Sequence, residues 1–334
     1  MAAATTRRVV LARRPEGPAT LDCFRVEEAE LAAPQDGQLQ IAAECLSVDA
    51  FIRTVLYESA YHAPVPIGAT LTALGVGRVI ESRSPDFAPG DGVFGPIGAQ
   101  TTAVAPAAMF RRVDEKRAPL RAWIGALGLT TGLTAYMGVR AVGQVAAGDT
   151  VVVSAAAGAV GSIAAQIARL DGGRVIGIAG GPEKCAFLTD RLGCDGAVDY
   201  RAGDVDAQLR AQAPEGMDVY FDNVGGDLLD VVLDQIRPRA RVVICGAISQ
   251  YDHMDEVRGP SLYLRLAERH ARMEGFAVNH FESRYDEAER QLADWLAGGE
   301  ITMPEHVVHG IERFPEALLT MFSGGNIGKI VVEP

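Results

Sequence analysis

The central part of the chain alternates short apolar runs with stretches in which apolar residues recur every three or four positions. The runs Thr150–Ser154 and Arg174–Ala179 predict buried strands, because they are short and rich in β-branched residues. Between them, Val160–Leu170 has helical spacing and predicts an amphipathic helix. Further strands are predicted at Ala197–Tyr200, Asp218–Asp222, Arg241–Cys245 and Arg272–Val278, and further helices at Glu183–Leu192 and Asp286–Leu296. Such alternation is typical of an α/β fold with a Rossmann-type, doubly wound parallel sheet.

The chain before Trp123 follows a different pattern. The runs Gln38–Ala43, Val76–Glu81 and Gly92–Gly95 predict short strands, and glycine and proline punctuate the segments between them. A further short apolar stretch, Val9–Ala12, predicts a first strand near the N-terminus. Many short strands with Gly/Pro turns are typical of a β-rich, barrel-like module.

The rhythm breaks again after residue 299. The tail predicts a strand at His306–His309, a helix at Pro315–Phe322 and a last strand at Lys329–Val332. We expect this tail to return to the N-terminal module. The chain of 334 residues is long enough for about two domains of ~150 residues. The predicted domains are therefore 123–299, which is doubly wound, and 1–122 together with 300–334, which is β-rich.

Composition narrows the possible partners. The chain has 31 Lys and Arg against 43 Asp and Glu, a formal net charge of −12. An acidic surface repels phosphate backbones, so we do not expect nucleic acid as a partner. No apolar run reaches the ~18 residues of a membrane span, and the apolar core of Met1–Arg14 is too short for a signal peptide. We therefore expect a cytoplasmic protein without a membrane partner.

The five cysteines do not form a recognisable metal or disulfide pattern. They are scattered and include no CxxC pair, which disfavours a disulfide framework or a structural zinc site. We expect buried thiols in a reducing compartment. Their positions are Cys23, Cys45, Cys185, Cys194 and Cys245.

A glycine-containing loop gives the strongest local signal for a ligand. The string SAAAGAVGS, residues 154–162, directly follows a predicted strand and opens a predicted helix. A phosphate can approach the backbone there, where the helix N-terminus offers free N–H groups and a partial positive charge. Gly158 would allow that approach, and Gly161 would let the helix pack on the strand. Since Ala156 replaces the usual first glycine, the loop is a variant of the dinucleotide fingerprint.

The end of the second strand indicates which dinucleotide is bound. An NAD site needs a carboxylate there, about 20 residues beyond the fingerprint, to bind the ribose 2′-hydroxyl. The segment Arg174–Gly181 contains no acidic residue, and Lys184 follows soon after it. A missing acid and an added base suit a 2′-phosphate, which a carboxylate would repel. The sequence therefore favours NADP(H) over NAD(H).

Several strings give the chain a resemblance to a known family. FDNVGG at 221–226 and CGAIS at 245–249 follow the AAAGAVG loop in the same order as in that family. The chain resembles the zinc-independent medium-chain dehydrogenases/reductases, and most closely the leukotriene B4 12-hydroxydehydrogenase/prostaglandin reductase group of alkenal and enone reductases. Matching strings run from about residue 40 to the C-terminus. They include 75–81, 87–91, 132–136, 183–184, 199–200, 273–276 and 326–329.

The resemblance implies a GroES-like substrate and catalytic domain, an NADP-binding Rossmann domain, a homodimer, and specific contacts to the cofactor. Residues of the glycine loop would hold the pyrophosphate. Lys184 and Tyr200, helped by Arg201, would hold the 2′-phosphate. Residues after the later strands would line the path from adenosine to nicotinamide, and three further residues would close around the nicotinamide end. The implied loop residues are Gly158, Ala159, Val160 and Gly161; the path residues are Asn223, Cys245, Gly246, Ala247, Ile248, Ser249 and Tyr251; the closing residues are Phe276, Val278 and Asn326.

The sequence departs from the zinc-using relatives of this family. Those relatives have a cysteine two residues before an aspartate, and here Ser47 precedes Asp49 at that spacing. The region that should read Gly-His-Glu reads LTALG at 71–75. His306 and His309 are the only close histidine pair, and their spacing places them on opposite faces of a strand. We expect no metal site.

Chemistry without a metal favours a conjugated substrate. Hydride added to the β carbon of an enone or enal spreads charge onto the carbonyl oxygen, where one or two hydrogen-bond donors suffice. The resemblance implies that the nicotinamide ribose hydroxyl is a donor at that oxygen, with a tyrosine assisting. Many members of the family have a tyrosine at the position of Phe51, so the candidate catalytic residues here are Tyr61 and Tyr263. Tyr263 is a few residues away from the position of the proposed catalytic tyrosine in animal members. Glu268 aligns better with that position.

The leading hypothesis is therefore an NADPH-dependent reductase of the C=C bond in small α,β-unsaturated ketones or aldehydes. Two alternatives remain open. An NADPH:quinone oxidoreductase could use the same site, since a quinone is a vinylogous enone. An NADP-binding sensor or structural protein with little catalysis would bind the cofactor without turnover.

Overall fold

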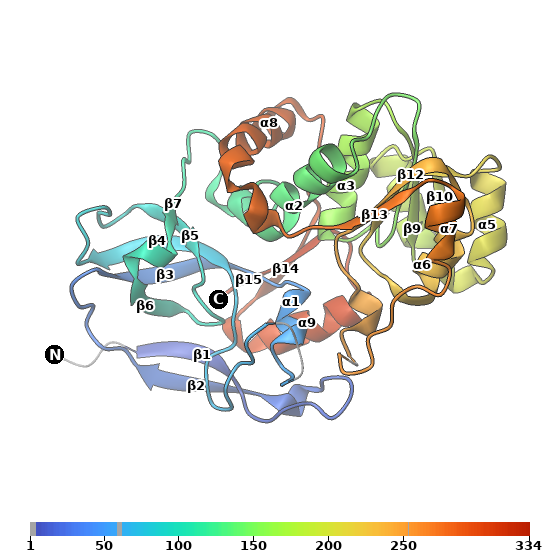
Figure 1. Ribbon diagram of the computed structural model, residues 1–334. Coiled ribbons are helices and arrows are strands. Elements are labelled where there is room, and N and C mark those ends of the chain that lie inside the picture. Colours follow the sequence, from blue (N-terminus) through green and yellow to red (C-terminus); the bar gives the residue numbers. More distant parts are fainter. Residues whose placement is uncertain (1–4, 59–61, 253) are drawn as a thin grey trace. The chain divides into compact units, whose positions relative to one another are not determined.

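The computed structural model describes residues 5–58, 62–252 and 254–334. The chain divides into two units (Figure 1). The first, which we call the barrel unit, contains Met1–Gly125, Asp252–Asp255 and Glu305–Pro334. The second, the Rossmann unit, contains Ala126–Tyr251 and Glu256–Pro304.

A parallel sheet of six strands forms the centre of the described Rossmann unit. Its order is β10-β9-β8-β11-β12-β13, and every neighbouring pair is parallel. Numbered from the first strand, this is the order 3-2-1-4-5-6 of a doubly wound dinucleotide-binding sheet. The strands are β8 (Thr150–Val153), β9 (Arg174–Ala179), β10 (Gly196–Asp199), β11 (Met217–Asp222), β12 (Ile236–Ile244) and β13 (Arg272–Gly275).

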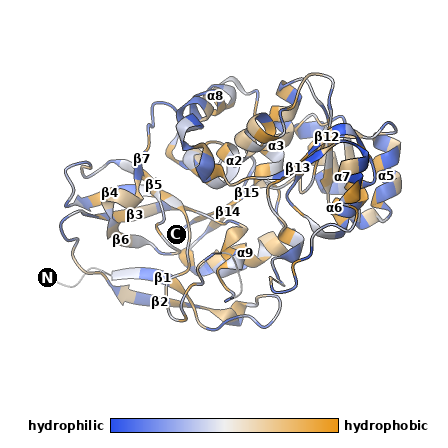
Figure 2. Ribbon diagram, in the orientation of Figure 1, coloured by the Kyte–Doolittle hydropathy of each residue, from blue (hydrophilic) through white to orange (hydrophobic). Residues whose placement is uncertain are grey.

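Helices connect these parallel strands. In α3 (Ala159–Leu170), Ile163 and Ile167 are fully buried, as the helical spacing of its apolar residues requires. Polar and apolar residues mix in helices such as α5 (Figure 2). The other α-helices are α2 (Thr134–Tyr136), α4 (Pro182–Ala186), α5 (Val205–Gln212), α6 (Gly226–Leu233), α7 (Leu264–Glu268) and α8 (Tyr285–Gly298). Segments 129–133, 137–142 and 187–191 are π-helical, and 200–202, 248–250 and 278–284 are 3₁₀.

The barrel unit is built mainly from antiparallel strands. Among its described residues, β14-β15-β3-β4-β5-β7 form one sheet with β6 paired to β3, and β1 and β2 form a second. The strands are β1 (Thr5–Leu11), β2 (Phe24–Glu30), β3 (Gln38–Ser47), β4 (Gly75–Ser82), β5 (Gly92–Gly95), β6 (Thr102–Pro106), β7 (Arg111–Arg112), β14 (Glu305–His309) and β15 (Lys329–Glu333). Its α-helices are α1 (Phe51–Thr54) and α9 (Phe314–Phe322), and 21–23, 107–109, 120–123 and 311–313 are 3₁₀.

A buried ion pair lies inside the barrel unit. The Nζ atom of Lys329 is 2.7 Å from a carboxylate oxygen of Asp49 and donates to the carbonyl oxygen of Val48 at 3.0 Å. Ser47 donates its hydroxyl to the other oxygen of Asp49 at 2.5 Å. Buried charges persist only when they are paired and hydrogen-bonded, as here. Ser47, at the position compared with a zinc ligand, thus belongs to a polar cluster that supports the β3–β15 pairing.

The structure confirms the α/β fold class, with a doubly wound sheet and a β-rich module, and it places the C-terminal tail in the barrel unit. One predicted strand was too long by three residues, and two other elements differ from their predicted bounds by one residue at each end. Strand β13 ends at Gly275, and Val278 instead begins a 3₁₀ turn. Tyr200 begins a 3₁₀ turn that is capped by Asp199, so it is not part of β10. The helix predicted at Glu183–Leu192 begins at Pro182 and widens to π spacing from Phe187.

The structure also bears on the predicted burial of the cysteines and on the search for membrane-spanning helices. Cys23, Cys45 and Cys194 are buried as expected, whereas Cys185 and Cys245 are only partly buried. No helix in the described part of the chain is both long and apolar enough to cross a membrane.

Candidate functional site

The predicted cofactor residues of the Rossmann unit lie at one edge of its sheet. Strand β8 pairs with both β9 and β11, so the strand order reverses between β8 and β11. In open α/β sheets, ligands bind outside the carboxyl ends of the strands at this switch point. The glycine loop follows β8, Lys184 follows β9, Tyr200 follows β10, Asn223 follows β11, the segment 245–251 follows β12, and Phe276 follows β13.

The glycine loop has the shape of an anion cradle. Ala155 has a φ of +46°, and Gly158 is the N-cap of α3 in an extended conformation with no side chain capping the helix. A Cβ atom on Gly161 would lie 2.3 Å from the carbonyl oxygen of Ala155, so only glycine fits there. On Gly158, the only nearby atom would be the same oxygen at 3.2 Å. The loop therefore fits a pyrophosphate, with Gly161 required for packing and Gly158 leaving room for the ligand.

The ends of β9 and β10 form a cationic corner. Tyr200 packs over Gly180, where an added Cβ would lie 2.7 Å from the phenol oxygen. The Arg201 guanidinium lies 5.8 Å from the centre of the Tyr200 ring. Partial burial, and then the charge of Arg201, lower the pKa of Lys184. Two cations and a phenol at one corner fit a phosphate dianion, since its charge would offset both.

Asp199, the acidic residue at the end of β10, accepts hydrogen bonds from the main chain. One oxygen of Asp199 accepts hydrogen bonds from the N–H of Gly181 at 2.7 Å and of Arg201 at 2.9 Å. These bonds, with Gly181 the stronger, lower the pKa of Asp199. Asp199 therefore shapes the corner through the backbone of Gly181 and Arg201.

Hydrogen bonds from side chains and the main chain link the glycine loop to the segments after β11 and β12. Asn223 donates its side-chain amide to the carbonyl oxygen of Ser154 at 2.7 Å, and its N–H to the Ser154 hydroxyl at 2.8 Å. Ile248 donates its N–H to the carbonyl oxygen of Asn223 at 3.1 Å. Ser249 donates its hydroxyl to the carbonyl oxygen of Val224 at 2.6 Å. The structure thus brings together the residues predicted for the path from adenosine to nicotinamide.

Sequence reasoning missed the buried polar residue between these segments. Asp222 is fully buried, and it contacts Ser154 and Tyr220. Its position inside the FDNVGG string was the available signal, although the string alone does not say that the carboxyl points inward.

The residues predicted for the nicotinamide end are divided between the two units. Phe276 packs at Gly138, where an added Cβ would lie 2.8 Å from its ring, and its ring centre is 6.2 Å from that of Phe281. Val278 begins the following 3₁₀ turn. Asn326 belongs to the barrel unit, is buried, and donates its side-chain amide to the carbonyl oxygen of Gly328 at 2.8 Å.

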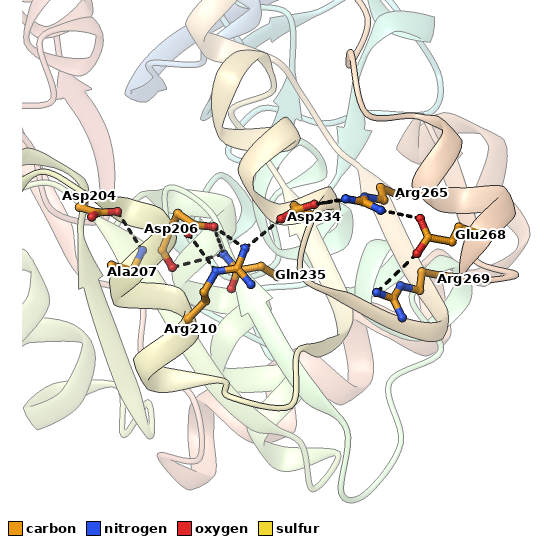
Figure 3. A network of polar contacts seen from close by, with 9 residues as sticks. All are labelled: Asp204, Asp206, Ala207, Arg210, Asp234, Gln235, Arg265, Glu268 and Arg269. Atoms are coloured by element: carbon orange, nitrogen blue, oxygen red, sulfur yellow. Dashed lines mark hydrogen bonds and ion pairs between the residues drawn. The ribbon is translucent and has the colours of Figure 1, made fainter.

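Of the two candidate catalytic tyrosines, the structure describes Tyr263. Tyr61 lies outside the described residues. Tyr263 precedes α7 and is 57% exposed. Glu268, the alternative position in register, takes part in a surface network through Arg265 at 2.5 Å and Arg269 at 3.7 Å (Figure 3). A catalytic role for Tyr61 or Tyr263 stays a prediction.

One of the two histidines considered for metal binding has another partner. His309 contacts Glu333 through its Nδ1 atom at 2.8 Å. Over residues 5–58, 62–252 and 254–334, no three His, Cys, Asp or Glu side chains gather closely enough to hold a metal ion.

Comparisons with known proteins agree with this geometry. Residues 7–113 match a family model described as the N-terminal domain of oxidoreductase, and residues 159–297 match one described as zinc-binding dehydrogenase. The chain is 36% identical over 334 residues to the NADPH-dependent curcumin reductase of Escherichia coli (strain K12), covering 98% of this chain and 96% of the relative. It is 37% identical over 291 residues to the NADP(+)-dependent 2-alkenal reductase of Nicotiana tabacum, covering 86% of this chain and 84% of the relative.

A mammalian relative and a solved structure extend the comparison. Prostaglandin reductase 1 of Bos taurus is 36% identical over 316 residues, with 93% of each chain covered. The crystal structure of CurA from Vibrio vulnificus in complex with NADPH superposes with a TM-score of 0.92 at 36% identity, covering 98% of both chains. The chain therefore belongs to the zinc-independent medium-chain dehydrogenases/reductases, in their group of alkenal and enone reductases.

Proposed function

We propose that this chain is an NADPH-dependent reductase of the carbon–carbon double bond in small α,β-unsaturated ketones and aldehydes. The observation that carries the proposal is the pairing of two features at one sheet edge. An uncapped glycine loop fits a pyrophosphate, and a corner with Lys184, Arg201 and Tyr200 fits a 2′-phosphate. The relatives named as curcumin reductase, 2-alkenal reductase and prostaglandin reductase belong to the same group.

The residues of the Rossmann unit bind and orient the cofactor. Gly158, Ala159, Val160 and Gly161 would hold the pyrophosphate, and Lys184 and Tyr200 the 2′-phosphate. Asn223 and the segment 245–251 would line the rest of the path, and Phe276, Val278 and Asn326 would close around the nicotinamide. When bound, NADPH supplies the hydride.

The substrate needs little more than placement and a hydrogen-bond donor. Reduction at the β carbon develops negative charge on the carbonyl oxygen, and a preorganised donor at that oxygen lowers the barrier. Tyr61 and Tyr263 are the proposed donors that would assist the nicotinamide ribose hydroxyl at this oxygen, and water would protonate the α carbon. Replacing each tyrosine with phenylalanine tests this: loss of the donor should lower kcat for an enone by at least about tenfold. Equal kcat in both variants and the wild type would remove both tyrosines from the mechanism.

The activity is tested by following NADPH oxidation with a panel of substrates. The panel contains a straight-chain enone, a 2-alkenal, a benzoquinone and a saturated ketone, with NADH as the cofactor control. We expect turnover of the enone and the alkenal, with the saturated carbonyl compound as product. Turnover of the quinone alone would replace this proposal with a quinone reductase. Binding of NADPH without any turnover would favour a sensor or structural role.

The assembly and location of the chain are part of the proposal. Resemblance to the family supports a homodimer in the cytoplasm, in which 123–299 binds the cofactor and 1–122 with 300–334 binds the substrate. Light scattering of the purified protein should give twice the chain mass of 35.4 kDa. A single-chain mass would contradict the homodimer, and recovery of the protein outside the cytoplasmic fraction of fractionated cells would contradict the location.

A further inference from the structure

A buried carboxyl group lies at the switch point of the Rossmann sheet. Asp222 is the last residue of β11, and Ser154 is the first residue after the neighbouring strand β8. One oxygen of Asp222 accepts two side-chain hydrogen bonds, from the Tyr220 hydroxyl at 2.9 Å and the Ser154 hydroxyl at 3.1 Å. The same oxygen accepts the N–H of Val224 at 2.9 Å and of Gly225 at 3.0 Å.

These bonds connect three segments that are distant in sequence. The Ser154 bond reaches the start of the glycine loop, and the bonds from Val224 and Gly225 set the turn that leads into α6. The main-chain oxygen of Asp222 accepts the N–H of Cys245 at 2.8 Å and of Gly246 at 3.1 Å, which fixes the start of the segment after β12. Asp222 therefore contacts three of the segments that the proposed function assigns to NADPH, two through its carboxyl group and the third through its main-chain oxygen.

Burying the Asp222 carboxyl group costs free energy of folding. Asp222 is fully buried, and among the described residues its second carboxyl oxygen has no hydrogen-bond partner. Burial raises the pKa of Asp222, although the hydrogen bonds from Gly225, Val224, Tyr220 and Ser154 lower it. A well-packed apolar residue is often no less stabilising than a buried ionisable one. The hydrogen bonds of Asp222 therefore point to a role in orienting its neighbours and not to a net gain in stability.

We propose that the carboxyl group of Asp222 is the positioning group of the NADPH cradle, holding the glycine loop and the 223–225 turn in register for the pyrophosphate and nicotinamide parts of the cofactor. This proposal rests on the proposed function, because it requires NADPH at this edge of the sheet. It assigns Asp222 no contact with the reacting atoms.

The 2′-phosphate corner gives the proposal an internal reference. Lys184 and Tyr200 follow β9 and β10, and neither is bonded to the Asp222 cluster in the contacts described above. The compound 2′,5′-ADP carries the 2′-phosphate but lacks the second phosphate and the nicotinamide. Loss of Asp222 should therefore weaken NADPH much more than 2′,5′-ADP.

The experiment compares Asp222→Ala with Asp218→Ala. Asp218 is a matched control, because it lies at the opposite end of the same strand and accepts the N–H of Thr150 from β8 at 2.8 Å. Dissociation constants are measured for NADPH by nucleotide fluorescence and for 2′,5′-ADP by calorimetry, together with the melting temperature of each variant. We expect Asp222→Ala to weaken NADPH by about tenfold or more, with 2′,5′-ADP changed less than about threefold. Asp218→Ala should lower the melting temperature and leave both constants unchanged.

A conservative variant sharpens the result. Asp222→Asn keeps one carbonyl oxygen for the four donors, so it should recover most of the NADPH affinity that Asp222→Ala loses. If Asp222→Ala does not fold, Ser154→Ala is measured in its place. That change removes the hydroxyl that bridges Asp222 and Asn223, and it should weaken NADPH selectively by about threefold or more.

The outcomes separate this proposal from the proposed function. Unchanged NADPH affinity in Asp222→Ala, or in Ser154→Ala where that variant replaces it, would overturn the positioning role. Equal weakening of NADPH and 2′,5′-ADP would overturn it too, because it would show general loosening of the unit. If the wild-type protein binds neither ligand, the proposed function itself fails.

Discussion

Two polar networks in the Rossmann unit show how burial changes what a carboxylate does. In the surface network, Asp234 lies between Arg210 at 2.8 Å and Arg265 at 2.7 Å (Figure 3). The side chains of Arg210 and Arg265 are 52% and 38% exposed. The cradle network around Asp222 is fully buried and contains no cation among the partners described above. One network pairs an acid with partly exposed cations, and the other joins a buried carboxyl group to hydroxyl and N–H groups.

The pKa values of the two acids move in opposite directions for this reason. Arg265 and then Arg210 lower the pKa of Asp234, whereas burial raises the pKa of Asp222. Water competes for each bond of the surface network, so losing one partner costs little. In the buried network, a donor that loses its acceptor pays the full cost of its desolvation. Each bond there therefore constrains the shape of the site.

The largest effect should come from disrupting the packing beside the cradle network. Gly161→Val places a side chain where even a Cβ would lie 2.3 Å from the Ala155 carbonyl oxygen. Because that oxygen belongs to the backbone and cannot swing away, the helix must separate from the strand. We expect a loss of about 3 kcal/mol or more in the free energy of unfolding, together with loss of NADPH binding. Denaturant titration and NADPH fluorescence measure the two effects.

Gly158→Val is the matched control for that variant. An added Cβ at Gly158 meets only the Ala155 oxygen at 3.2 Å, so the fold should tolerate it with a loss of about 1 kcal/mol or less. The side chain would nevertheless fill the space expected for the pyrophosphate, and NADPH binding should disappear. If Gly158→Val keeps wild-type NADPH affinity, the loop is only structural.

The next effect concerns the corner of the site that is only half-buried. Lys184→Ala removes one cation opposite the expected 2′-phosphate while leaving Arg201 in place. We expect the KM for NADPH to rise by about tenfold to a hundredfold, and the KM for NADH to change by less than about twofold. Steady-state kinetics with both cofactors on one enone decides this. An equal rise in both KM values would show that Lys184 does not bind the 2′-phosphate.

The pH dependence of cofactor choice follows from the same lysine. Burial and then Arg201 lower the pKa of Lys184 below its ordinary value of 10.5 in the free protein. A bound phosphate would favour the charged form and raise that pKa again. NADPH binding above the lowered pKa must therefore take up a proton, which weakens it, whereas NADH binding does not. We expect the NADPH-to-NADH affinity ratio to fall as the pH rises toward 10.5, and to stay flat in Lys184→Ala.

The sequence could predict the parts of the site that depend on neighbouring residues. The glycine loop was predictable because one strand, one turn and one helix define it within a few residues. The prediction that Lys184 binds a 2′-phosphate came from the lack of an acidic residue at the end of the second strand and the lysine soon after it. The contacts of Asp222 were not predictable, because its partner Ser154 is 68 residues away and they meet only when β8 and β11 pair. The same holds for Tyr200 over Gly180, which depends on how β9 and β10 end.

Boundaries and solvent exposure were harder to predict than element types. The segment Arg272–Val278 predicts a strand, yet β13 ends at Gly275. Composition alone does not say how far the neighbouring strand β12 extends to pair with it, and β12 pairs only up to Ile244. Tyr263 was proposed from resemblance, and its exposure of 57% depends on how the chain approaches α7.

The smallest effect should come from the surface network. Asp234→Asn removes the charge between Arg210 and Arg265, but both arginines keep other partners, Asp206 at 2.9 Å and Glu268 at 2.5 Å. Exposed pairs contribute about 0–1 kcal/mol each, and salt screens them. We expect a loss of less than about 1 kcal/mol that shrinks further at about 1 M salt, with no change in NADPH affinity. Denaturant titrations at low and high salt, with a parallel NADPH titration, measure this. A loss as large as that of Asp222→Ala, or one that does not shrink with salt, would mean that partner number, and not burial, decides what a carboxylate contributes in this unit.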